Sequence, residues 1–361
     1  MRVIYPNKET LPINRRRRYK IIMTAKGIRT GHTHRFISTF IRSQVDSLRK
    51  YVQVFPFAID DTISPIGIFR NAFELRHRIN DIQPDIVHAQ WGSTTALVSL
   101  LAAYRKCPLV ISFSGGDLIK DPTAQSIVWV LRSKLVVGVS RFCSRYAKAL
   151  IVKSPNLYSA LPISAKPIAR ILPNGVDINK FRPILKAEAR RALNLDSESH
   201  IVLFNKGQTR NQEYKCIELA ESAISILEKR VSLGNVVFLV ISIEPHERMP
   251  LYLNAADLLL VTSISEGSPN IVKEAMACNL PVVTVECGDV IDRLKNISPS
   301  SIVSRDPKLL ADAMESMLIS NQRSNGREEI MKQGLDIGTT AQSLIKIYSD
   351  VLTRDKKGHA D

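Results

Sequence analysis

Two carboxylates in the segment SEGSPNIVKEAMACNLPVVTV have a spacing that suits a ligand with several hydroxyl groups. The segment covers residues 265–285, and Glu266 and Glu274 lie eight positions apart around the small residues Gly267 and Ser268. A carboxylate can accept hydrogen bonds from two neighbouring hydroxyl groups, so the pair could hold a ribose diol and the hydroxyls of a sugar. Gly267 would let the backbone approach such a ligand closely. The alternative is that both glutamates are solvated surface charges.

The residues between the two glutamates predict the start of a helix. Ser268 can cap a helix whose first residue is Pro269, where a missing N–H costs nothing. The helix is expected to run to Cys278, with Asn279 in a left-handed conformation and Pro281 beyond it. N–H groups at a helix start, with the positive end of the helix dipole behind them, form a cradle for phosphate. The flanking apolar runs LLLVTS and LPVVTV predict strands, which places this cradle at the carboxyl edge of a parallel sheet.

Strand-like and helix-like segments alternate along the rest of the chain. In the first stretch, YKIIMTA (19–25) is a short apolar run, and RFISTFIRSQVDSLRK (35–50) has apolar residues at helical spacing. A second alternation begins at HIVLFN (200–205) and continues past the glutamate segment. This order predicts an α/β protein with two doubly wound domains, each a parallel sheet with helices on both faces.

A connecting region separates the two stretches. ILPNGVDINKFRPIL (171–185) contains prolines and an Asn-Gly turn, a composition typical of linkers. We interpret Asn174, Gly175 and Asp177 in this region as structural residues. The predicted parts of the chain are a basic N-terminal extension at 1–18, a first domain at 19–180, a second domain at 181–335, and a terminal amphipathic helix with its tail at 336–361.

The charge of the chain favours an anionic partner. Among 361 residues, Lys and Arg number 50 and Asp and Glu number 34, which gives a net charge of +16 and a pI near 9.7. Nucleic acid, phosphorylated substrates and an anionic membrane surface all fit this excess. Nucleic acid fits least, because aromatic residues make up only 6% of the chain and no recognition motif interleaves them with the basic residues.

The cysteines and apolar runs indicate the compartment. The five cysteines have no metal-ligand spacing, so we expect reduced thiols in a cytoplasmic protein. No signal peptide is visible, and no apolar run reaches the roughly twenty residues that span a bilayer. We therefore expect a soluble or peripherally attached protein. RRRRYK (15–20) and RFISTFIR (35–42) are candidate contacts with anionic headgroups on the inner face of the plasma membrane.

The segment AADLLLVTSISEGSPNIVKEAMACNLPVV closely resembles the donor-site signature of family-4-like retaining glycosyltransferases of GT-B fold, the glycosyl transferases of group 1. Their E-x7-E pair is met here by Glu266 and Glu274. The resemblance implies that Glu274 binds the ribose hydroxyls of the nucleotide and that Glu266, a catalytic residue, binds hydroxyls of the transferred sugar. The donor-binding set in this loop is Glu266, Gly267, Ser268, Asn270, Ile271 and Glu274, with the backbone of Asn270 and Ile271 at the diphosphate or sugar.

A second segment resembles the part of the family's donor site that supplies positive charge. FNKGQTRNQEYKCIELAESA (204–223) places Arg210 and Lys215 at the positions of an arginine and a lysine about five residues apart. These two catalytic residues would neutralise the charge that develops on the leaving diphosphate. Lys206 is offset from this pattern. No DxD-like acidic cluster is present, and the adjacent Asp60 and Asp61 have no counterpart in the family, so the resemblance implies a reaction without metal or cofactor.

Segments of the first domain resemble the family's other loops. KGIRTGHTHRFISTFIRSQVDSLRK resembles the glycine loop and first helix that close over the donor phosphates, with Gly31 as the loop glycine. DIVHAQWG and VISFSGGDL resemble loops on the acceptor and sugar sides, which makes His88, Ser114 and Asp117 candidate acceptor-side residues. Ser114 stands where a histidine is common in the family, and this departure weakens inference about the donor sugar.

The resemblance as a whole implies two Rossmann-like domains that face each other across a cleft, with a final helix that returns to the first domain. The implied activity is retaining transfer of a sugar from a nucleotide diphosphate donor to a hydroxyl acceptor, a lipid-linked or polysaccharide precursor of the bacterial cell surface. UDP is the commoner carrier in the family and GDP is second. The alternatives are a GT-B scaffold that binds nucleotide sugars without catalysis and a nucleotide-sugar epimerase of the same two-domain build.

Overall fold

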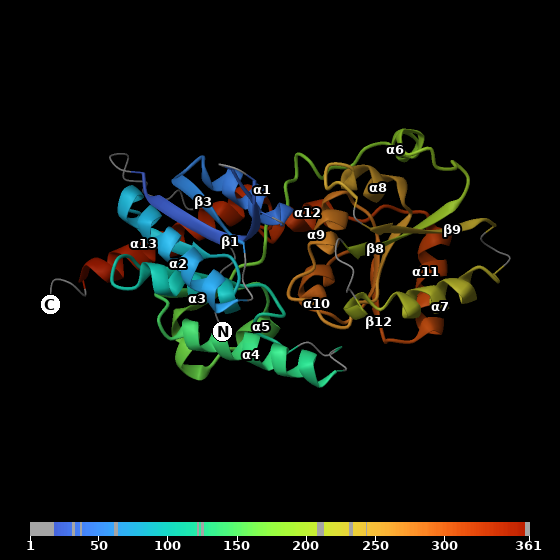
Figure 1. Ribbon diagram of the computed structural model, residues 1–361. Helices are drawn as coiled ribbons and strands as arrows, with labels where there is room; N and C mark the ends of the chain where they lie inside the picture. The colour runs from blue at the N-terminus through green and yellow to red at the C-terminus, as the bar shows by residue number, and fades with distance from the viewer. Residues whose placement is uncertain are drawn as a thin grey trace. The chain divides into compact units, whose positions relative to one another are not determined.

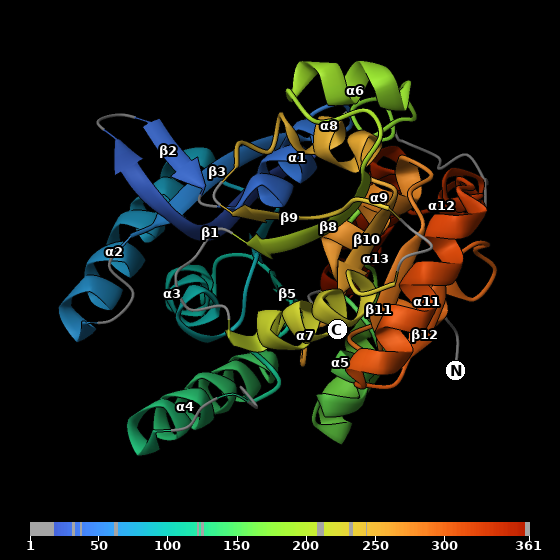
Figure 2. The same ribbon diagram turned by 90° about the vertical axis from the view of Figure 1, so that its right-hand side faces the viewer.

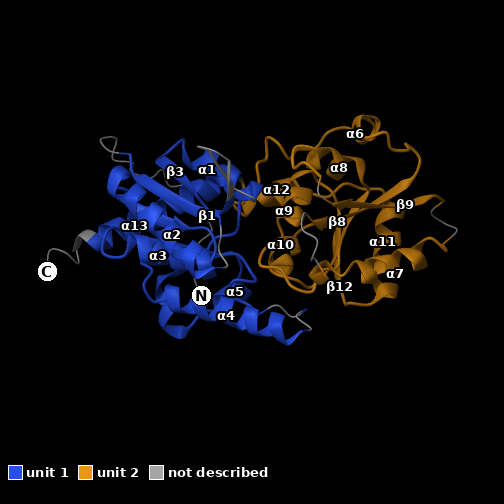
Figure 3. Ribbon diagram, in the orientation of Figure 1, with its two compact units in different colours: residues 1–175, 337–361 blue, residues 176–336 orange. Residues whose placement is uncertain are grey.

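The chain divides into two compact units, each described here by itself (Figure 3). Unit 1 comprises Met1–Gly175 with Ile337–Asp361, and unit 2 comprises Val176–Asp336. The predicted divisions are at 180/181 and 335/336. The computed structural model describes residues 18–30, 33–36, 38–60, 64–120, 123, 126–207, 213–230, 234–242 and 244–357.

Unit 1 is built on a parallel sheet. In the described part of the chain its strand order is β3-β1-β4-β5-β6-β7. Strand β2 pairs antiparallel with the end of β1 (Figure 2). The strands are β1 (Lys20–Thr30), β2 (Thr33–Phe36), β3 (Gln53–Ile59), β4 (Ile86–Ala89), β5 (Leu109–Phe113), β6 (Ala149–Val152) and β7 (Ala169–Ile171). The helices are α1 (Thr39–Leu48), α2 (Pro65–Ile82), α3 (Ser93–Ala103), α4 (Ile127–Ser144), α5 (Pro155–Ala160), the 3-10 helix η1 (Ile163–Ile168) and α13 (Ile337–Lys357).

Apolar residues on both faces of this sheet enter two separate cores. Along β1, Ile22 packs with α2 and α3, whereas Ile21 and Met23 pack with α1 and α13. This alternation follows from the two-residue period of a strand and explains why the central strands read as continuous apolar runs. The terminal helix α13 contributes Tyr348 and its apolar neighbours to the core that it shares with β1.

The start of unit 1 differs from its sequence prediction. The strand that begins at YKIIMTA continues to Thr30 and forms a hairpin with residues 33–36, which pair with Gly27–Thr30. The predicted helix over 35–50 therefore begins only at Thr39, after the N-cap Ser38. Helical spacing of the apolar residues extended the prediction backward into a strand, because a periodic pattern gives no boundary by itself. The elements α4, β6 and α5 are additional to those predicted.

Unit 2 repeats the same architecture. Its described strands form a parallel sheet of order β12-β11-β10-β8-β9. The strands are β8 (His200–Gly207), β9 (Val236–Ser242), β10 (Leu258–Val261), β11 (Val282–Val285) and β12 (Ser301–Val303). The helices are α6 (Lys186–Ala192), η2 (Glu213–Lys215, a 3-10 turn), α7 (Ile217–Leu227), α8 (Met249–Ala255), α9 (Asn270–Ala277), α10 (Val290–Leu294), α11 (Pro307–Ser320) and α12 (Gly326–Lys332). Helices cover both faces, with α8 and α9 on one core and α7 and α11 on the other.

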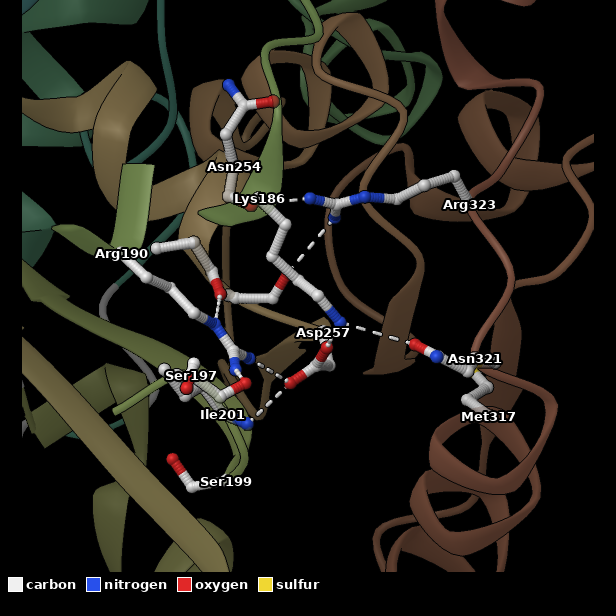
Figure 4. A network of polar contacts seen from close by, with 12 residues as sticks. Lys186, Arg190, Ser197, Ser199, Ile201, Asn254, Asp257, Met317, Asn321 and Arg323 are labelled. Carbon is white, nitrogen blue, oxygen red and sulfur yellow. Dashed lines mark hydrogen bonds and ion pairs between the residues drawn. The ribbon is translucent and has the colours of Figure 1, made fainter. Parts of the chain in front are cut away.

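A buried polar network holds the amino end of β10, the strand that leads into the glutamate loop (Figure 4). The carboxylate of Asp257 accepts hydrogen bonds from Lys186 and Arg190, each at 2.8 Å, and from the amide of Ile201 on β8 at 2.6 Å. The Arg190 side chain is only 3% exposed, so Asp257 compensates a positive charge that is buried away from water. Arg323 donates to the carbonyl oxygens just before the strand, at Asn254 and Ala256. The network thereby fixes β10 at the edge opposite the loop.

Both units are doubly wound parallel sheets, which confirms the predicted fold class. In sheets of this kind, ligands bind outside the carboxyl ends of the strands. None of the helices in the described residues is long and apolar enough to cross a membrane.

Candidate functional site

The described donor-site candidates of unit 2, among them Lys215, Glu266 and Glu274, gather at the carboxyl edge of its sheet. The segment with Lys215 follows β8, and the glutamate loop follows β10 and leads into α9. His246 follows β9, and Asp289 follows β11. These four strands are neighbours in the sheet, in the order β11-β10-β8-β9. Parallel strands end at the same edge, and for this reason residues far apart in the sequence meet there.

Glu266 and Lys215 form a close ion pair. Nζ of Lys215 lies 2.5 Å from Oε1 of Glu266, and the two side chains are only 14% and 17% exposed. The hydroxyl of Ser263 donates to the same carboxylate oxygen at 3.3 Å. Burial acts to lower the pKa of Lys215, but the adjacent Glu266 outweighs it and the pKa lies above its ordinary value. Lys215 is therefore a fixed positive charge, as a partner of diphosphate must be.

Hydrogen bonds between two loops set this geometry. The Thr262 hydroxyl, at the end of β10, donates to the carbonyl oxygens of Lys215 and Cys216, each at 2.8 Å. The Ile264 amide donates to the carbonyl of Tyr214 at 2.7 Å. The backbone that carries Lys215 is thus joined directly to the loop that carries Glu266.

Glu274 has a basic partner that the sequence analysis did not identify. Nε2 of His246 lies 2.9 Å from Oε1 of Glu274, and Nδ1 of the same ring lies 2.8 Å from Nζ of Lys180. The Lys180 ammonium can only donate, so Nδ1 accepts and Nε2 carries the proton given to Glu274. The ring of Phe181 packs edge-on against His246, with centroids 5.3 Å apart. A histidine just after a predicted strand was the available sequence signal.

The first turn of α9 differs in detail from the prediction. The helix begins at Asn270 and its N-cap is Pro269, without a side-chain cap. Ser268 is not the cap that was predicted, and its hydroxyl accepts a hydrogen bond from Nζ of Lys273 at 2.8 Å. Asn279 does adopt the predicted left-handed conformation, with φ 56°. Asn270 and Ile271 occupy the first turn, where helix N–H groups have no acceptor within the helix.

A cluster of buried charged residues contacts the glutamate loop. Lys273 is 1% exposed, and burial lowers its pKa to about 8, although nearby Asp289 favours the charged form. Burial also raises the pKa of Asp289, against the positive charges of Lys273 and Arg293. Nε of Arg293 lies 3.2 Å from Oδ2 of Asp289. Gly288 packs so tightly that an added Cβ would lie 2.9 Å from the carbonyl oxygen of Gly267. The loop after β11 is therefore in direct contact with the glutamate loop.

Two predicted donor residues, Gly31 and Arg210, lie outside the described residues, as does Asp61. Their assignments stay predictions. Lys206 is described, exposed on β8, and Asp60 lies 3.6 Å from Arg70.

His88 lies inside unit 1. Its ring is fully buried, with Nδ1 2.6 Å from the hydroxyl of Tyr348 on α13 and Nε2 2.8 Å from the hydroxyl of Ser112. Burial, with a smaller effect of Lys153, lowers the pKa of His88 to about 3, so the ring is neutral. Through these two contacts His88 joins α13 to the sheet. Because the ring is fully buried, the structure does not support the predicted contact of His88 with an acceptor.

Asp117 organises the turn that follows β5. Its fully buried carboxylate accepts hydrogen bonds from the amides of Gly92, Ser114 and Gly115 at 2.8 to 3.0 Å. Burial raises the pKa of Asp117 despite these bonds. The Asp117 carboxylate therefore stabilises the turn. Ser114 in the same turn is half-buried and stays an acceptor-side candidate.

The linker residues have structural contacts. A Cβ at Gly175 would lie 2.7 Å from Cα of Ile337 at the start of α13, so only glycine fits there. The Asp177 carboxylate accepts from the amides of Asn179 and Lys180. Asn174 is half-buried. In the described part of the chain, no group of three or more His, Cys, Asp and Glu is placed to hold a metal ion.

The fold has clear counterparts among solved structures. Sucrose-phosphate synthase from Thermosynechococcus elongatus is similar with a TM-score of 0.73 at 18% identity, over 93% of this chain and 100% of that one. HepE of Anabaena, solved in complex with UDP-glucose, is similar with a TM-score of 0.67 at 15% identity, over 92% and 100% of the two chains. The fold is thus that of the GT-B glycosyltransferases, as the sequence resemblance implies.

Sequence comparison gives the family. Residues 192–320 match the family described as "Glycosyl transferases group 1", and residues 25–154 match that described as "Glycosyl transferase 4-like". The chain is 25% identical over 298 residues to a Bacillus subtilis protein that carries the name teichuronic acid biosynthesis glycosyltransferase TuaC, across 75% of this chain and 72% of that protein. The first part of the chain therefore belongs to the 4-like glycosyltransferases, and the second part belongs to the glycosyltransferases of group 1. The predicted family is confirmed.

Proposed function

We propose that this protein is a retaining glycosyltransferase that moves a sugar from a nucleotide diphosphate donor to a hydroxyl acceptor. One observation carries the proposal: each glutamate of the E-x7-E pair has its own basic partner at a single sheet edge. Glu266 pairs with Lys215, and Glu274 pairs with His246. Paired, partly buried carboxylates with fixed orientations are suited to hydroxyl recognition, unlike solvated surface charges.

The two pairs have different roles in the proposal. Glu274 accepts hydrogen bonds from the ribose diol, and Glu266 accepts them from the hydroxyls of the transferred sugar. The first turn of α9, with Asn270 and Ile271, receives the diphosphate at its positive end. Lys215, together with Arg210 from the sequence resemblance, stabilises the charge that develops as the diphosphate leaves.

The proposed reaction is a displacement on one face of the sugar. The bond from the anomeric carbon to the phosphate oxygen breaks, and a bond from that carbon to the acceptor oxygen forms on the same side. The departing phosphate oxygen takes the proton of the acceptor hydroxyl. Because lysine and arginine supply the positive charge, we expect transfer to need no metal and to persist in the presence of a chelator.

We further propose a UDP-sugar as donor, with GDP as the second candidate carrier. The UDP-glucose complex of the structurally similar HepE supports this choice. The similarity to a protein named for teichuronic acid biosynthesis supports a cell-surface polysaccharide precursor, lipid-linked or not, as acceptor. The proposed place of action is the cytoplasmic face of the plasma membrane.

A second candidate function is binding of nucleotide sugars without transfer. The observation that favours it is Ser114, which stands at the turn after β5 where the family commonly has a histidine. A binding protein would retain nucleotide affinity and show neither transfer nor slow hydrolysis of any donor.

The test starts with calorimetric titration of UDP and GDP, followed by a hydrolysis and transfer screen over a panel of nucleotide sugars. Glu274→Ala should abolish binding of the preferred nucleotide. The matched control is Glu286→Ala, which removes an exposed carboxylate just after β11 at the same sheet edge and should leave binding unchanged. Unaltered binding and turnover in Glu274→Ala would show that the donor site lies elsewhere.

A further inference from the structure

An exposed apolar stripe runs along α4 in unit 1. Val128, Leu131, Leu135 and Phe142 recur at spacings of three, four and seven residues, which places them on one side of the helix. Ile127 is 76% exposed and Leu135 is 67% exposed. Soluble proteins tolerate scattered exposed apolar residues, but a contiguous stripe on one helix indicates an interaction site.

The neighbouring helix α2 also exposes apolar side chains. On α2, Ile66, Phe69 and Phe73 also share one side, and the two phenylalanines are each 67% exposed. Figures 1 and 2 both show α3 between α2 and α4, and α3 packs against each of them. The segment at the end of α3 adds the exposed Tyr104. We call this surface of α2, α3 and α4 the apolar-basic face.

On α3 and α4, the only charged side chains of this face are basic. Neither helix contains Asp or Glu, and the sequence has eight Lys and Arg but no acidic residue from 122 to 176. On and next to α4, the exposed basic residues are Arg132, Lys134, Arg141 and Arg145. The Arg132 guanidinium lies over the ring of Trp129, 4.9 Å from its centroid. Aromatic and aliphatic side chains interleaved with cations are the composition of helices that lie in the headgroup region of a membrane.

We propose that the apolar-basic face docks this protein on an anionic lipid bilayer, with the stripe of α4 inserted at the level of the headgroups. The apolar side chains would enter the boundary of the acyl region, while the basic side chains bind lipid phosphates. Charge favours this occupant over a second copy of the chain, because pairing two such faces would bring like charges together. The inference rests on the proposed function, in which a lipid-linked acceptor lies at the membrane.

The experiment is co-sedimentation of the full chain with vesicles of phosphatidylglycerol and phosphatidylcholine, compared with phosphatidylcholine alone. We expect binding to the anionic vesicles only, weakened by high salt. The double variant Leu131→Glu, Leu135→Glu should reduce the partition coefficient by about tenfold or more. The matched control is Leu185→Glu, Ile319→Glu, which changes two apolar residues of unit 2 that are at least as exposed as Leu131.

The outcomes separate this inference from the proposed function. UDP titration of each variant in solution reports the donor site and the fold independently of vesicles. Vesicle binding that is equal in the α4 variant and the wild type would overturn the inference, as would no binding at low salt or self-association through this face in sedimentation velocity. Vesicle binding without nucleotide binding would instead contradict the proposed function and leave the docking face in place.

Discussion

Nε2 of His246 donates a hydrogen bond to Oε1 of Glu274 over 2.9 Å, although the two residues are 28 positions apart in the sequence. Lys180 fixes the ring from its other side through Nδ1. The carboxylate of Glu274 is therefore held in one orientation before a ligand arrives, and a pre-oriented acceptor loses less entropy on binding.

The first prediction concerns this contact. His246→Ala should raise the Kd for UDP by about tenfold, because the partly buried carboxylate of Glu274 loses the donor that orients it. His246→Gln, which keeps a donor near the same position, should recover part of the loss. Calorimetry measures both. His200→Ala, at the start of β8 and away from the carboxyl edge, is the control. Equal Kd values for His246→Ala and the wild type would remove His246 from the site.

The second prediction concerns the charge on the leaving group. Lys215→Ala should lower kcat for transfer by about 10²- to 10³-fold, as expected for loss of one electrostatic contact to a developing anion. Lys206→Ala removes an exposed lysine from the same strand region and should change kcat less than about twofold. Steady-state kinetics with the preferred donor measures kcat for both variants. Similar kcat values for Lys215→Ala and Lys206→Ala would contradict the role given to Lys215.

The third prediction concerns stability at the amino end of β10. Asp257→Ala should lower the free energy of unfolding by about 3–5 kcal/mol, because the buried Arg190 keeps its bonds to carbonyl oxygens but loses its charged partner. Asp312→Ala breaks a more exposed pair with Arg230 and should cost about 1 kcal/mol or less. Urea titrations monitored by circular dichroism provide both values. A loss below about 1 kcal/mol for Asp257→Ala would show that Arg190 finds another partner.

The fourth prediction concerns acid stability. The pKa of His88 is lowered from 6.5 to about 3 in the folded protein, so only the unfolded chain takes up this proton between these values. Stability is unaffected by His88 above pH 6.5 and falls as the pH drops below it, by about 2 kcal/mol at pH 5.

The measurement is the difference in unfolding free energy between pH 7 and pH 5. His88→Gln should reduce this difference by the stated amount, even though it lowers stability at both pH values. His77→Gln, at an exposed position on α2, should leave the difference as in the wild type. An unchanged pH dependence in His88→Gln would contradict the assignment.

Local sequence predicted much of the fold and part of the site. Apolar runs such as HIVLFN predicted the strands, and Asn279 before Pro281 predicted the end of α9. These signals can be identified from sequence because they depend only on neighbours along the chain. The start of α1 was misplaced, since helical periodicity extends into the hairpin of β1 and β2. Ser268 was misassigned as a cap because the helix begins one residue later than predicted, with Pro269 as its N-cap.

By itself, the sequence determined the α/β architecture, the family, and the glutamate pair beside a helix start. Only the tertiary structure decided which side chains partner those glutamates: Lys215, 51 positions from Glu266, and His246. It also decided that His88 and Asp117 turn inward and that the apolar side chains along α4 are exposed. The physical reason is that periodicity reports which side of an element is apolar, whereas the partner across a sheet edge is fixed by packing between distant segments.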